Sequence, residues 1–89
     1  MKITCHTLIE NGYERNRAGY NLTDPSYTKI FPEKYSIKVV KLPSGYEAST
    51  DLKGSTHILH QPNTIEQIEV FFANLWNFYD TTNNLPQKL

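Results

Sequence analysis

The sequence predicts a small α+β fold, in which a C-terminal amphipathic helix covers one face of an antiparallel meander of three or four strands, with a short helix at the N-terminus. Two observations lead to this prediction. Residues 62–79 repeat apolar side chains at helical spacing, whereas residues 26–61 alternate apolar and polar side chains between short turns. These turns are too short to contain crossover helices, so successive strands must run antiparallel.

The first segment, residues 3–11, fits either a short helix or a strand. Its apolar residues do not alternate strictly, and Gly12 can supply the left-handed conformation that ends many helices, which favours the helix. Asn11 followed by Gly12 is also typical of a tight β-hairpin, so a strand that returns through Tyr13 is the alternative. The polar residues 13–26 predict a long loop with room for one short strand.

The middle of the chain contains four segments with the composition of strands. The clearest of them is rich in β-branched residues and ends at the turn formed by residues 43–45. Its alternation directs Tyr35, Ile37 and Val39 towards the helices and leaves Val40 and Leu42 on the open face of the sheet. The predicted strands are residues 26–31, 35–42, 46–52 and 55–61.

The C-terminal helix begins with a predicted capping box. Thr64 accepts from the backbone N–H of Gln67, and the Gln67 side chain reaches back to the backbone N–H of Thr64. Helical spacing creates one broad apolar side, with Trp76 and Phe78 at its margins and Val70 on the polar side. We expect residues 1–80 to form one domain and residues 81–89 a flexible polar tail. The apolar side comprises Ile65, Ile68, Phe71, Phe72, Leu75, Trp76, Phe78 and Tyr79.

Composition limits the classes of protein that fit this chain. Its 89 residues, of which 38% are hydrophobic and 12% aromatic, suffice for one folded domain with one core. Nine Lys and Arg balance nine Asp and Glu, so global charge indicates neither a polyanion nor a membrane as partner. The single cysteine excludes an intramolecular disulfide, and the N-terminus lacks the apolar run of a signal peptide. We therefore expect a cytoplasmic protein in which Cys5 is a small buried residue.

No local motif for catalysis or cofactor binding occurs in the chain, neither a phosphate-binding glycine loop nor a nucleophile or zinc motif. His57 and His60 are three residues apart, so in a strand they point to opposite faces and cannot easily share a metal ion. Cys5 and His6 would need a third group that the sequence does not indicate. We expect no catalytic residue, no metal site and no cofactor, and hence no enzyme.

A protein-binding role is the leading hypothesis, because more apolar and aromatic side chains are present than the predicted core needs. Large aromatic side chains concentrate at protein interfaces. The partner would be another protein, or a second copy joined through the open sheet face. In size and pattern the chain resembles the short orphan proteins of phages and other mobile elements, which implies an inhibitor or accessory factor; this resemblance covers no particular residues. The candidate interface residues are Val40, Leu42, Val70, Trp76 and Phe78.

Binding of single-stranded nucleic acid is the alternative. A sheet that interleaves lysines with aromatic residues can neutralise phosphates and stack bases. The neutral net charge and the lack of a known nucleic-acid motif argue against it. The candidate nucleic-acid face comprises Lys29, Lys34, Tyr35, Lys38, Lys41 and Tyr46.

Overall fold

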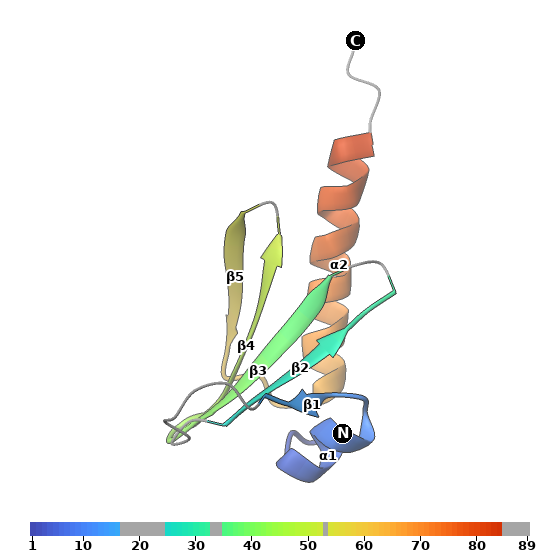
Figure 1. The fold of residues 1–89 in the computed structure, drawn as a ribbon. Helices are drawn as coiled ribbons and strands as arrows, with labels where there is room; N and C mark the ends of the chain where they lie inside the picture. The colour runs from blue at the N-terminus through green and yellow to red at the C-terminus, as the bar shows by residue number, and fades with distance from the viewer. Residues whose placement is uncertain (17–24, 33–34, 53, 85–89) are drawn as a thin grey trace.

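The computed structural model describes residues 1–16, 25–32, 35–52 and 54–84, with side chains through Tyr79. It confirms the α+β class: helix α2 runs along one face of an antiparallel sheet, and the short helix α1 lies at one end (Figure 1). The sheet has five strands in the order β1-β2-β3-β4-β5. The elements are α1 (Cys5–Glu10), β1 (Glu14–Arg15), β2 (Ser26–Ile30), β3 (Ser36–Leu42), β4 (Gly45–Leu52), β5 (Ser55–His60) and α2 (Ile65–Asn84).

The predicted number of three or four strands was wrong, because the sheet has β1 as a fifth strand. This strand has only two residues, and Glu14 pairs with Thr28 while Arg15 pairs with Tyr27. Just after it, the backbone N–H of Asn16 donates to the carbonyl of Ser26 at 2.9 Å. Two residues are too short for an alternating pattern, so this strand depends on the edge that β2 offers rather than on a local signal.

The N-terminal segment is a helix, as the sequence favoured. Thr4 and Thr7 form a capping box: the Thr4 hydroxyl accepts from the Thr7 N–H at 3.0 Å, and the Thr7 hydroxyl accepts from the Thr4 N–H at 2.9 Å. Gly12 follows the helix with φ of +92°, a conformation that residues with a side chain rarely adopt. Cys5 is exposed, which corrects the prediction that it is buried; Leu8 is the buried residue of this short helix.

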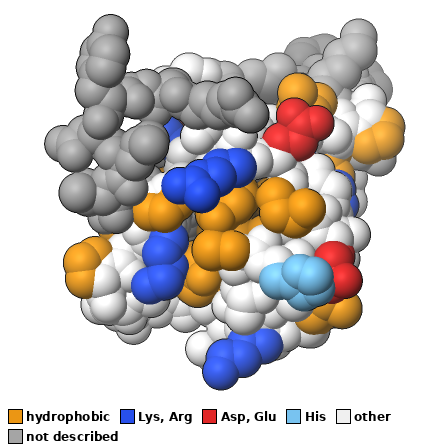
Figure 2. All heavy atoms as spheres, turned by 60° about the horizontal axis from the view of Figure 1, so that its bottom comes forward, with side chains coloured by type: hydrophobic (Ala, Val, Ile, Leu, Met, Phe, Trp, Pro, Cys, Tyr) orange, Lys and Arg blue, Asp and Glu red, His pale blue; other side chains and the backbone are white. Residues whose placement is uncertain are grey.

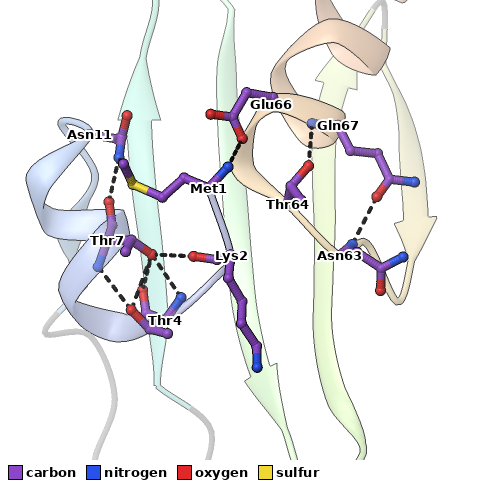
Figure 3. A network of polar contacts seen from close by, with 9 residues as sticks. All are labelled: Met1, Lys2, Thr4, Thr7, Asn11, Asn63, Thr64, Glu66 and Gln67. Carbon is purple, nitrogen blue, oxygen red and sulfur yellow. Dashed lines mark hydrogen bonds and ion pairs between the residues drawn. The ribbon is translucent and has the colours of Figure 1, made fainter.

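Only one of the two hydrogen bonds of the predicted capping box forms at the start of α2. Thr64 accepts from the backbone N–H of Gln67 at 3.0 Å, but the Gln67 side chain accepts from the N–H of Asn63 at 2.8 Å, not from that of Thr64. The backbone at Thr64 instead forms an antiparallel bridge with Lys2. Figure 3 shows this junction, in which the N-terminal ammonium of Met1 also contacts the carboxylate of Glu66. The chain terminus therefore ties α1 to the beginning of α2.

The other end of α2 lies beyond the predicted one. The helix continues past Tyr79 to Asn84, and Figure 1 shows its last turns extending past the end of the sheet. Residues 81–84, predicted as part of a tail, are therefore helical, and residues 85–89 lie outside the described part of the chain. A helix of this length spans about 30 Å, which exceeds the length of a typical strand.

The core lies between α2 and the inner face of the sheet. The predicted alternation of β3 is confirmed, because Ile37 and Val39 are fully buried while Ser36 and Lys38 are exposed. Two buried tyrosines complete the packing of β3: Tyr35 precedes the strand, and Tyr27 pairs with Val39 from β2. The buried apolar residues are Ile3, Leu8, Tyr13, Tyr27, Tyr35, Ile37, Val39, Ala48, Leu52, Ile65, Ile68 and Phe72.

Candidate protein-interaction surface

Helix α2 presents two flanks on either side of its buried stripe. Glu69 and Trp76 are seven residues apart, as are Phe71 and Phe78, so each pair lies on one line along the helix. The two lines are separated by the buried residue Phe72. The flank with Glu69 and Trp76 faces β2 and β3, where Trp76 stacks on Tyr35 with ring centroids 5.3 Å apart.

A polar cluster joins this first flank to β2. The carboxylate of Glu69 accepts from the hydroxyl of Tyr13 at 3.0 Å and lies 3.2 Å from the ammonium of Lys29. The Lys29 ammonium also lies over the ring of Phe31, 4.9 Å from its centroid. Burial raises the pKa of Tyr13 well above its usual value, and the negative charge of Glu69 raises it further. The polar groups of Glu69, Tyr13 and Lys29 therefore serve as hydrogen-bond and ion-pair partners for one another.

The second flank has no such covering among the described residues. It consists of Phe71, Leu75 and Phe78, at positions i, i+4 and i+7, and we call it the apolar flank. The side chain of Phe71 is 41% exposed and that of Phe78 is 65% exposed, whereas Leu75 packs partly against the core. Val70 is also exposed, but helical spacing places it outside this flank, on the outer side of the helix. The apolar flank is thus a hydrophobic surface supported from below by buried residues.

The apolar flank lies on the β5 side of the molecule. The opposite flank reaches Lys29 on β2, and β5 lies at the far edge of the sheet from β1 and β2. Tyr79 connects α2 to this side, because its ring lies 5.3 Å from that of His57 on β5. Figure 1 shows the β4–β5 hairpin beside α2 on this side. The apolar flank of α2 and the β5 edge of the sheet therefore lie on the same side of the molecule.

The structure divides the predicted interface residues among three places. Val70 and Phe78 are exposed on α2, as an interface requires. Trp76 packs against the core, where it closes the β2–β3 side. Val40 and Leu42 are half-buried on the open face of the sheet, where Val40 lies between the polar residues Ser26 and Glu47 of the neighbouring strands.

Sequence reasoning missed Phe71 and Ile58 as surface residues. Helical spacing assigns Phe71 to the broad apolar side, but that side is wider than the sheet can cover, and only its middle is buried. Ile58 on β5 is 45% exposed, because it points to the open face. Two signals could have indicated these surface residues: the width of the apolar side of the helix, and the alternation of the last strand, which directs Ile58 to the open face.

The candidate nucleic-acid residues do not share one surface. Tyr35 is buried and stacks between Phe31 and Trp76, so its ring faces the helix. Lys29 also lies on the helix side, as described above, and Lys38 is exposed on the open face. The ammonium of Lys41 lies over the ring of Tyr46, 5.4 Å from its centroid. Lys34 lies outside the described residues.

The end of the molecule that carries α1 has a mixed surface. Figure 2, in which this end comes forward, shows hydrophobic side chains gathered between Lys and Arg side chains. Burial, together with the neighbouring Cys5 thiol, raises the pKa of Tyr27 to about 12, and the same two causes raise the pKa of Tyr46. Both tyrosines therefore stay neutral at physiological pH.

Among the described residues, the ionisable side chains form no cluster that could hold a metal ion. Within residues 1–16, 25–32, 35–52 and 54–79, no three His, Cys, Asp or Glu side chains are placed to hold one ion. As predicted, the two histidines of β5 face opposite ways: His57 is half-buried against Tyr79, and His60 is exposed and lies 3.1 Å from Glu47. Neither described helix is long and apolar enough to cross a membrane.

Comparisons with protein-family models, curated proteins and solved structures found no match to this chain.

Proposed function

We propose that this chain is a non-enzymatic protein-interaction module that binds its partner through the apolar flank of α2. The observation that carries this proposal is the exposure of Phe71 and Phe78 on a helix whose buried stripe is already complete. Exposed phenylalanines contribute little to the stability of their own fold, whereas burying each of them in a complex would contribute roughly 1.5 to 3 kcal/mol.

The chemistry of the flank favours an apolar protein surface as its partner. Residues 70–79 contain no charged side chain, so this part of α2 attracts neither phosphates nor a charged peptide. Positions i, i+4 and i+7 are the spacing with which a helix anchors in a hydrophobic groove. The amides of Asn74 and Asn77 are exposed and can form the polar rim of such an interface. An inhibitor or accessory factor that occupies a groove on a larger protein fits these features.

Affinity capture from a lysate of the source organism tests this proposal. The tagged wild-type protein is compared with the double variant Phe71→Glu and Phe78→Glu and with the matched control Asn74→Glu, which adds a charge to an exposed position of the same helix. The double variant should lose a stoichiometric partner that the wild type and the control retain. Circular dichroism must show that all three proteins remain folded.

Two outcomes would contradict the proposal. A partner captured equally by all three proteins would bind elsewhere on the surface. Recovery that depends on nucleic acid, and is abolished by nuclease treatment of the lysate, would instead favour the nucleic-acid hypothesis and its lysines.

A further inference from the structure

Strand β5 lies at an outer edge of the sheet, where no other described strand pairs with it. The backbone N–H of Gln61 donates to the carbonyl of Tyr46 at 3.1 Å, which places the odd-numbered residues of β5 in the ladder with β4. In an antiparallel pair the intervening residues direct their N–H and C=O groups away from the neighbouring strand. Those residues are Thr56, Ile58 and His60, and no described strand lies beyond them in the sheet.

The two edges of the sheet differ in their protection. At one edge, β1 is two residues long and both residues are charged, features that discourage pairing with another chain. At the other edge, β5 has six residues and contains no Lys, Arg, Asp, Glu, Pro or Gly. Its central residue, Ile58, exposes 45% of its surface. This edge therefore has the composition that favours the addition of a strand.

We propose that β5 pairs antiparallel with β5 of a second copy, which would join the two sheets into one. This inference goes beyond the proposed function, because it concerns a strand edge and a copy of this chain. A two-fold axis at Ile58 uses all three free residues: Ile58 faces Ile58 of the copy, and Thr56 faces His60 of the copy. The edge is thus complementary to itself.

The side chains support a second copy as the occupant. In this register like charges of Lys, Arg, Asp or Glu never oppose one another within the paired strands, because β5 has none. The two exposed isoleucines cover each other on the open face. On the helix face, His57 pairs with Leu59 of the copy, and the apolar flanks of the two α2 helices turn towards the same joint. A two-fold pair would therefore reduce the exposure of both Ile58 and the apolar flank.

Sedimentation velocity across a concentration series tests this inference on the full chain. The wild type should dimerise. Ile58→Pro removes an N–H that points away from β4, so the hydrogen bonds between β4 and β5 remain. Because the dimer loses this donor from both copies, its dissociation constant should rise at least about thirtyfold. The control Ile58→Thr keeps the N–H and the β-branched shape, and it should still dimerise.

A second variant keeps the inference testable if Ile58→Pro does not fold. Ile58→Lys places two positive charges against each other at the two-fold axis, so the dimer should weaken and recover partly at high salt, which screens the repulsion. A wild type that stays monomeric at every concentration, or a dimer unaffected by either variant, would overturn the inference. If the wild type stays monomeric but captures a partner that the Phe71→Glu, Phe78→Glu variant loses, only the dimer inference is overturned. A β5 dimer without a flank-dependent partner would overturn the proposed function alone.

Discussion

The two flanks of α2 carry comparable aromatic side chains but have different surroundings. On the β2 side, Trp76 stacks on Tyr35, and Glu69 binds Tyr13 and Lys29. On the β5 side, Phe71 and Phe78 remain largely exposed. The same helix therefore builds a core with one flank and leaves the other available. The difference shows that hydrophobicity alone does not separate a structural aromatic residue from one that can bind.

The largest expected effect concerns the aromatic residues of the two flanks. Trp76→Ala should lower the free energy of unfolding by about 3 kcal/mol, because it opens a gap beside Tyr35. Phe78→Ala should lower it by less than about 0.5 kcal/mol, because that ring is mostly in water already. Urea denaturation of the two variants measures both values. Equal losses would show that both flanks belong to the core.

The polar cluster of the β2 flank should have the next largest effect. Glu69→Ala leaves the hydroxyl of Tyr13 and the ammonium of Lys29 without their shared acceptor, at an expected cost of about 2 kcal/mol. Glu69→Gln should cost less, because its amide oxygen can still accept from Tyr13. Urea denaturation again provides the measurement, with Asn74→Ala as an exposed control on the same helix. A loss no larger than that of the control would mean that the cluster is only a surface contact.

Alkaline pH should weaken the same side of the molecule. Burial raises the pKa of Tyr13 and Tyr27 in the folded protein above the usual 10.0, so the unfolded chain ionises first. Their contribution to stability is therefore complete below about pH 10 and declines above it, by up to about 1.4 kcal/mol per pH unit for each tyrosine. Urea midpoints on both sides of pH 10 test this decline. Tyr13→Phe should have a shallower decline, and an unchanged slope would contradict the assignment.

The smallest effect is expected at the start of α2, which both flanks share. Thr64→Ala removes the acceptor of the Gln67 N–H and should cost about 1 kcal/mol. Because the helix keeps its register, capture of a partner by the apolar flank should not change. Thermal or urea unfolding gives the stability, and the capture experiment gives the binding. Loss of binding at unchanged stability would show that the cap residue itself contacts the partner.

Most elements of the fold were predictable because their signals are local. The alternation of β3, the turns that bound β4 and β5, and the Thr64 cap each involve a few neighbouring residues. Strand β1 has no local signal and forms against the edge of β2. The exposure of Cys5 also had no local signal, since it depends on where α1 packs. These features come from contacts between distant parts of the chain.

The candidate site was predictable only in part. Val70 and Phe78 are exposed as an interface requires, but Trp76 belongs to the core edge, and Phe71 takes its place on the surface. Helical spacing shows which residues share a side of α2, but it does not show how much of a broad side the sheet will cover. Lys29 illustrates the same limit, because only the fold brings it to Glu69.

The sequence by itself determined the elements that depend on neighbouring residues: the C-terminal helix with its Thr64 cap, alternating strands and an antiparallel order enforced by short turns. The tertiary structure decided which surfaces stay exposed. It set α2 across the inner face with one flank on β2 and β3, and it left β5 as the unprotected edge. The physical reason is that hydrogen-bonded turns and caps are local, whereas burial depends on what the folded chain places opposite each side chain.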